Sequence, residues 1–124
     1  MSDDSQIRSV IQTYFDCMYE SSADKTHAAF HPDAWITGYL PDGYHQLSVS
    51  QFADMVSSKQ PSPKDSGEDA RLDVVSLDIA GNTAVAQVRD DYLGLTFLDT
   101  LSFIKKDDEW SILNKLFHVE GPAQ

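Results

Sequence analysis

The sequence predicts an α+β fold in which three N-terminal helices pack on a curved, mostly antiparallel sheet. Two patterns in the residue order predict it. In the first half of the chain apolar residues recur at helical spacing, and in the second half they alternate with polar residues between short turns. The chain has 124 residues, of which 41% are hydrophobic, so we expect one domain over residues 1–124 with a packed core.

The first helix is expected over residues 5–19. Its apolar side chains recur every three or four positions and therefore share one face: Ile7, Val10, Ile11, Tyr14, Phe15 and Met18. A second, short helix is expected over residues 25–30. Asp24 can cap its start, and Pro32 disfavours helical backbone at His31, where the helix should end.

A strand is expected over residues 34–40, because it is rich in aromatic and β-branched side chains and ends at the turn Pro41-Asp42-Gly43. Ser48 and Gln51 form a capping-box pattern that starts the third helix. The apolar face of that helix holds Phe52, Met55 and Val56. Residues 57–69 are rich in Pro, Ser and Gly and predict a mobile surface loop.

The rest of the chain predicts an antiparallel meander. Its four strands are expected at residues 71–79, 83–92, 95–105 and 110–119. They are separated by the short turns Gly81-Asn82, Leu93-Gly94 and Asp107-Asp108. Helices followed by such a sheet are typical of an α+β domain with the helices on one sheet face.

The turns also predict which side chains face the helices. A two-residue turn at Asp107-Asp108 sets residue 105 opposite residue 110, and alternation then assigns every other residue of each strand to one face. The more apolar face should be the inner one. Four polar residues interrupt it towards the Gly94 end: Asp90, Asp99, Asn114 and His118.

Charge and composition exclude several classes of function. The chain has 20 acidic and 9 basic residues and a formal net charge of −11, so we expect neither nucleic acid nor a membrane surface as a partner. There is no apolar run of ~20 residues and no basic N-terminal segment, so we expect a cytoplasmic protein. One cysteine and four histidines without metal-ligand spacing predict no metal site, and no cofactor is expected.

The order of elements resembles the nuclear transport factor two-like (NTF2-like) superfamily of cone-shaped domains. The similar stretches are Phe30-His31-Pro32-Asp33-Ala34 at a helix-to-strand corner and Asp108-Glu109-Trp110-Ser111-Ile112 in the last hairpin. Phe97-Leu98-Asp99 and Asn114-Lys115-Leu116-Phe117-His118 are similar to the sub-group labelled putative lumazine-binding. The resemblance implies a cystatin-like cone with an internal pocket, a fold that hosts both enzymes and binding proteins.

Ketosteroid isomerase offers a more distant resemblance at two positions. Tyr14 in Val10-Ile11-Gln12-Thr13-Tyr14 and Asp99 in Leu98-Asp99 are similar to the tyrosine and the neutral aspartic acid that form its oxyanion hole. The resemblance therefore implies two hydrogen-bond donors here. The general base of that enzyme corresponds to Gly38, which cannot accept a proton.

The predicted site combines these residues with the inner face of the sheet. Asp99, Tyr14 and His118 are the candidate catalytic residues, because an Asp–His pair can perform acid–base catalysis. Asp99 can instead be a carboxylate held by Tyr14 or Asn114, and His118 can simply be exposed. The candidate ligand-binding residues are His31, Trp35, Phe52, Met55, Asp90, Tyr92, Phe97 and Asn114. Their alternative roles are ordinary core packing for the aromatic residues and an ion pair with Arg71 for Asp90.

Two functions fit this site. The first is a small-molecule-binding domain with a mixed apolar and polar pocket and no turnover. The alternative is a cofactor-independent lyase or isomerase acting on an enolisable carbonyl compound, with His118 or His31 as the base. A protein-interaction adaptor is a third class, disfavoured because no partner motif accompanies the domain. The outer sheet face should expose the apolar patch Leu98, Leu113 and Phe117, which predicts a homodimer through that face.

Overall fold

The computed structural model describes residues 2–124, which form three helices and one six-stranded sheet. The helices are α1 (Asp3–Tyr19), α2 (Ala23–Ala29) and α3 (Val49–Ser58). The strands are β1 (Phe30–Leu40), β2 (Gly43–Ser48), β3 (Leu72–Ala80), β4 (Thr83–Tyr92), β5 (Leu95–Lys106) and β6 (Glu109–Pro122). Their order in the sheet is β2-β1-β6-β5-β4-β3, and β1 and β6 run parallel while the other neighbours are antiparallel. The predicted α+β fold is confirmed.

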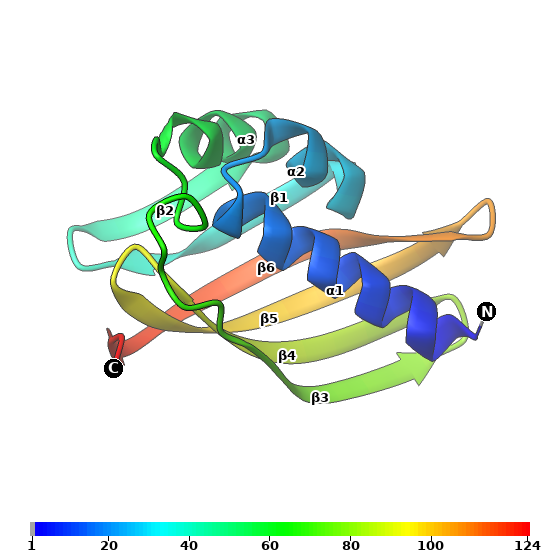
Figure 1. Ribbon diagram of the computed structural model, residues 1–124. Helices are drawn as coiled ribbons and strands as arrows, with labels where there is room; N and C mark the ends of the chain where they lie inside the picture. Colours follow the sequence, from blue (N-terminus) through cyan, green and yellow to red (C-terminus); the bar gives the residue numbers. More distant parts are fainter. Residues whose placement is uncertain (1) are drawn as a thin grey trace.

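The helices cover one face of the curved sheet. Figure 1 shows α1 lying across the strands β4 to β6, while α2 and α3 lie near β1 and β2. The capping box of α3 forms as predicted, since Gln51 N donates to Ser48 Oγ at 3.2 Å and Ser48 N donates to Gln51 Oε1 at 2.9 Å. Of the helices within residues 2–124, none combines the length and apolarity needed to span a membrane.

One strand was not predicted. Residues 43–48 form β2, which pairs with β1 through Leu40↔Gly43 to Trp35↔Ser48 and completes a hairpin around the turn at Pro41. The segment alternates half-buried and exposed residues at the sheet edge, so its pattern is weak. This hairpin curls over one end of the helical layer and supplies part of the functional cavity described below.

A β-bulge at Leu113 changes the predicted register of β6. Phe103 pairs with Ile112 as predicted, but Ser102 pairs with Asn114, so Leu113 is an extra residue on β6. Beyond this point the predicted register is wrong by one residue, which moves every side chain to the other face. Lys115 is buried on the inner face, whereas Asn114, Leu116 and His118 are exposed on the outer face.

Trp35 also lies on the outer face, contrary to its predicted place in the pocket. It is 47% exposed and lies beside Asn114 of β6. Alternation along β1 buries its neighbours Ala34 and Ile36 against the helices, and this leaves Trp35 pointing away from them.

The segment that joins α3 to β3 is attached to the end of α1. Helix α3 continues to Ser58, two residues into the predicted loop. Lys64 N donates to the carbonyl of Tyr19 at 2.9 Å, and the Tyr19 hydroxyl donates to the carbonyl of Glu68 at 2.8 Å. The Ser21 hydroxyl donates to the carbonyl of Lys59 at 2.6 Å. These bonds hold the segment against the helical layer.

Candidate functional site

A cavity of about 130 Å³ lies at one end of the molecule, between the helices and the inner face of the sheet. Its apolar walls come from α1, α3 and five strands, and their larger side chains are Met18, Phe52, Met55, Tyr92, Phe97 and Phe117. Leu93, in the β4–β5 turn, also lines it and is 46% exposed, which places the mouth at this turn. An engineered cavity of about 150 Å³ holds benzene. The enclosed volume therefore fits a group of about that size.

Asp90 places a carboxyl group in the cavity wall. Its side chain is fully buried, and no N–H or hydroxyl group within residues 2–124 donates a hydrogen bond to either carboxyl oxygen. Burial raises the pKa of Asp90 well above its usual value, and the neighbouring Asp99 raises it further through its charge and a hydrogen bond between the two carboxyl groups, whereas Lys115 and Tyr14 act in the opposite direction. An unpaired carboxylate in an apolar wall would cost several kcal/mol, so the group is held as the uncharged acid.

Asp99 and Tyr14 lie behind Asp90 and do not line the cavity. The Tyr14 hydroxyl donates to Asp99 Oδ2 at 2.6 Å, both residues are fully buried, and no N–H or hydroxyl group of the described chain donates to Asp99 Oδ1. Burial raises the pKa of Tyr14 well above its usual value, and the neighbouring carboxyl groups of Asp90 and Asp99 raise it further. The two residues therefore bond to each other, and the predicted pair of donors to one ligand atom is not formed.

Lys115 lies on the inner face, where the predicted register had placed its neighbour Asn114. It is 5% exposed and lines the cavity. Its Nζ lies 4.7 Å from the ring centres of both Tyr14 and Phe52, and 5.7 Å from that of Phe117. Within residues 2–124, no carboxylate oxygen lies at ion-pair distance from this nitrogen. Three aromatic rings therefore surround the amine, and no carboxylate of the described residues pairs with it.

His45 supplies a third polar group, near the cavity mouth. Its side chain is 33% exposed, and its Nε2 lies 2.7 Å from Asp42 Oδ1 in the β1–β2 turn. This hydrogen bond holds the pKa of Asp42 below its usual value. The sequence analysis did not place His45 in the site, because the strand that carries it was not predicted.

Gly38 explains why the base of ketosteroid isomerase has no counterpart. A side chain at this position would collide with the backbone oxygen and the ring of Phe117 on the neighbouring strand. Only glycine leaves room for the Phe117 ring, which packs edge-on against Phe97 at a centroid distance of 6.0 Å. A carboxylate at position 38 would displace one cavity wall.

Comparison with known proteins identifies the family. Residues 2–118 match the family described as putative lumazine-binding. The chain belongs to this family. Aldolase FrzH from Cladobotryum sp is 28% identical to it over 105 residues, which cover 85% of this chain and 82% of that protein.

Solved structures show the same fold. An NTF-2 like protein of unknown function from Silicibacter pomeroyi DSS-3 has a TM-score of 0.87 at 20% identity, covering 97% of this chain and 100% of that one. A domain of unknown function with a cystatin-like fold, from Nostoc punctiforme PCC 73102, has a TM-score of 0.71 at 18% identity over 93% of this chain and 75% of that one. The expected NTF2-like, cystatin-like architecture is thereby confirmed.

In this member of the putative lumazine-binding family, five predicted residues line the cavity: Phe52, Met55, Asp90, Tyr92 and Phe97. Four do not. The bulge in β6 turns Asn114 and His118 outward, and Trp35 lies on the outer face of β1. His31 lies at the α2–β1 corner, where its Nδ1 accepts a hydrogen bond from Asp33 N at 3.1 Å. Among residues 2–124, no three His, Cys, Asp or Glu side chains are arranged to hold a metal ion.

Proposed function

We propose that this protein is a cofactor-independent lyase of the aldol type, acting on a small enolisable carbonyl compound. The observation that carries the proposal is the Asp90 carboxyl group, which is buried beside Asp99 and forms part of the wall of an apolar cavity that also contains the Lys115 amine. A perturbed acid in a cleft is a marker of functional sites, because a structural carboxylate would be given partners.

The chemistry follows from the protonation state of Asp90. An uncharged acid can donate its proton to a carbonyl oxygen, which draws electrons from the adjacent carbon and acidifies the neighbouring C–H bond. Apolar walls make this hydrogen bond stronger than it would be in water, and they shield an enol or enamine from unwanted protonation. Breaking or forming the bond between the α- and β-carbons then completes an aldol or retro-aldol reaction.

The size and lining of the cavity restrict the substrate. About 130 Å³ suits a ketone or aldehyde with roughly the bulk of benzene, and the mostly apolar walls disfavour highly charged sugars or phosphates. The similarity to Aldolase FrzH, at 28% identity, supports carbon–carbon bond chemistry in a protein of this family.

The proposal is tested with diacetone alcohol, a small β-hydroxyketone that splits into two acetone molecules. Proton NMR in D₂O follows both the cleavage and the exchange of α-hydrogens. We expect turnover by the wild type and a rate ~10²–10⁴-fold lower for Asp90→Asn, the usual cost of losing a general acid. Asp78→Asn, an exposed change on β3, should leave the rate unchanged. Absence of cleavage and exchange above buffer, or an equally active Asp90→Asn, would contradict the proposal.

Binding without turnover is the second candidate, favoured by the family's description and by the apolar lining. Lumazine is a fused two-ring molecule and exceeds a benzene-sized cavity. A thermal-shift comparison of lumazine with butanone separates the two functions. A ligand at ~100 times its Kd stabilises the folded state by ~2.7 kcal/mol. A shift with lumazine that disappears in Phe97→Ala, without any turnover, would favour the binding function.

A further inference from the structure

Lys115 is placed unusually for a lysine. The side chain lies in a wall of aromatic rings, and its amine faces a cavity that also contains the buried Asp90 carboxyl. The amines of Lys25 and Lys105, by contrast, form ion pairs at 2.8 Å and 3.0 Å with carboxylates at the surface. Lysines are rarely buried unless they are paired, so this placement requires an explanation.

The aromatic rings can hold a cation, but they also exclude water from the amine. The rings of Tyr14 and Phe52, each 4.7 Å from Nζ, occupy positions where water would otherwise solvate the nitrogen. A lysine amine that is desolvated in an apolar pocket is the usual form of a nucleophilic lysine. Water exclusion also favours imine formation, because that reaction releases water.

We propose that the Lys115 amine forms a Schiff base with the carbonyl carbon of the substrate, with Asp90 transferring the protons. The inference rests on the proposed function and assigns the covalent step within it. It makes Lys115 a catalytic residue, whereas Tyr14 and Asp99, which do not line the cavity, are positioning residues behind Asp90.

The step balances, with water as its only by-product. The lone pair of Nζ attacks the carbonyl carbon, a C–N bond forms, and one nitrogen-bound proton moves to the oxygen. Asp90 gives its proton to the resulting hydroxyl group, which leaves as water. The product is a protonated imine beside an Asp90 carboxylate, two opposite charges that stabilise each other in the apolar cavity.

The same two residues then form the carbon nucleophile. The Asp90 carboxylate removes a proton from the α-carbon, and the electron pair of that C–H bond shifts towards the imine to give a neutral enamine. In the retro-aldol direction the Asp90 carboxylate takes the proton of the β-hydroxyl group, the bond between the α- and β-carbons breaks, the β-carbon leaves as a carbonyl compound, and the electron pair of the broken bond gives the enamine. Protonation of the enamine and addition of water restore the free amine, the Asp90 acid and a carbonyl product.

Another role for Lys115 would be a permanent cation that stabilises an enolate oxygen without forming a bond. Only the Schiff-base role produces a covalent adduct between Lys115 and the substrate. Sodium cyanoborohydride reduces an imine to a stable secondary amine, which peptide mapping by mass spectrometry can assign to one of the six lysines of the chain. Butanone is the probe, because it fits the cavity and has enolisable hydrogens.

We expect the reduced butyl group on Lys115 ahead of the other five lysines. Lys115→Met should abolish the adduct, and Lys115→Arg, which keeps the positive charge and controls for folding, should abolish it as well. Lys106→Met is the matched control, since Lys106 is exposed on β5, and it should leave the Lys115 adduct unchanged. Both Lys115 variants should lower α-hydrogen exchange by ~10²-fold or more, the scale expected for a lost catalytic group.

The outcomes separate this inference from the proposed function. The wild type could exchange α-hydrogens but carry the butyl group only on surface lysines. This result would overturn the Schiff base on Lys115 without contradicting the proposed lyase function. Exchange in Lys115→Arg at the wild-type rate would do the same. Wild-type protein with neither exchange nor an adduct on Lys115 would overturn both. Thermal melting of each variant verifies that a lost adduct does not reflect a lost fold.

Discussion

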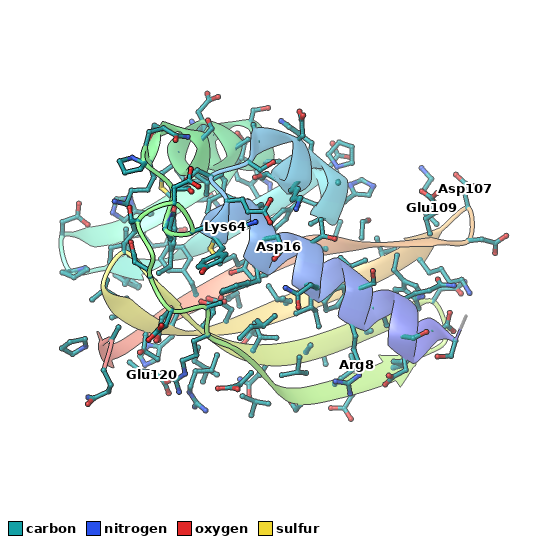
Figure 2. The ribbon with its side chains drawn as sticks, in the orientation of Figure 1. Arg8, Asp16, Lys64, Asp107, Glu109 and Glu120 are labelled. Carbon is teal, nitrogen blue, oxygen red and sulfur yellow. The ribbon has the colours of Figure 1, made fainter. Side chains whose placement is uncertain are left out.

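Two carboxyl groups near opposite ends of the inner sheet face have opposite surroundings. At the hairpin end, Asp3 Oδ1 accepts a hydrogen bond from Trp110 Nε1 and another from Lys105 Nζ, both at 3.0 Å. At the cavity end, no N–H or hydroxyl group of the described chain donates to the Asp90 carboxyl. Figure 2 shows Asp107 and Glu109 at the tip of the β5–β6 hairpin, near the start of α1, and Glu120 at the other end of the molecule.

The pKa of each of these two carboxyl groups shifts in the direction that its neighbours predict. Hydrogen bonds from Trp110 and Lys105 lower the pKa of Asp3, whereas burial and the nearby Asp99 raise that of Asp90. Through these hydrogen bonds Asp3 joins the start of α1 to the β5–β6 hairpin and stabilises the fold. Asp90 weakens the fold at neutral pH, and such a residue is expected where chemistry needs an uncharged acid. The comparison sets a carboxylate of α1 that bonds to the last hairpin against a buried carboxyl group in the cavity wall.

The largest expected effect is on the pH dependence of stability at Asp90. Its folded pKa lies above its unfolded value, so between those values the unfolded state binds fewer protons. The free energy of unfolding of the wild type should therefore fall, relative to Asp90→Asn, by ~1.4 kcal/mol per pH unit from about pH 4 upward. Urea unfolding of both proteins from pH 4 to pH 7 measures this slope. Parallel curves would mean that Asp90 ionises equally in both states.

Gly38→Ala should have the next largest effect. The added methyl group meets the Phe117 backbone, which cannot move aside as a flexible side chain would, so we expect a loss of ~1–3 kcal/mol in the free energy of unfolding. The displaced Phe117 ring should also weaken butanone binding at the cavity end. Chemical denaturation at one pH checks the stability. Wild-type stability in this variant would show that β1 and β6 are more loosely packed here than described.

Asp3→Asn should give a smaller effect of opposite sign. The folded pKa of Asp3 lies below its unfolded value, so its carboxylate contributes stability above about pH 4 that is lost as the pH falls through the folded pKa. The wild type should be slightly more stable than Asp3→Asn at pH 7, and the difference should vanish in acid. If the difference in the free energy of unfolding grew on acidification, the folded pKa of Asp3 would be raised and not lowered, and the contrast between Asp3 and Asp90 would be wrong.

The smallest expected effect on the fold is at Leu116, the neighbour of Lys115 on the opposite face of β6. Leu116 is 56% exposed and, with Trp35, it replaces Phe117 in the apolar patch of the outer face. The homodimer remains a prediction. Leu116→Glu should change the stability of the protomer by less than ~0.5 kcal/mol yet dissociate a dimer through this face. Sedimentation velocity of both proteins at micromolar concentration tests it, and a monomeric wild type would contradict the prediction.

The sequence predicts the fold well, because helical spacing and short turns are local signals. The α1 and α3 stripes, the Ser48 capping box and the pairing of β4 with β5 all follow from residues close together in the chain. The same signals place Asp90 and Phe97 on the inner face, where both line the cavity.

The part of the site on β6 could not be derived in this way, because one inserted residue reverses all later side chains. A signal was present in the sequence. Leu113 directly follows Ile112, and beyond them the apolar residues Phe117 and Val119 continue the odd-numbered phase, with Lys115 between them. Choosing the more apolar phase after Ile112 would have placed Lys115 inside. The pairing of β1 with β6 joins distant segments and leaves no comparable local pattern.

The most direct test of the account is a carbon-13 NMR titration of the aspartate side-chain carboxyl groups, assigned with Asp90→Asn and Asp3→Asn. We predict that the Asp90 signal keeps the shift of a protonated acid well above pH 4, while Asp3 remains ionised to a pH below its usual pKa. An Asp90 signal that titrates near pH 4, like an exposed aspartate, would contradict the claim that the cavity holds an uncharged acid beside the Lys115 amine.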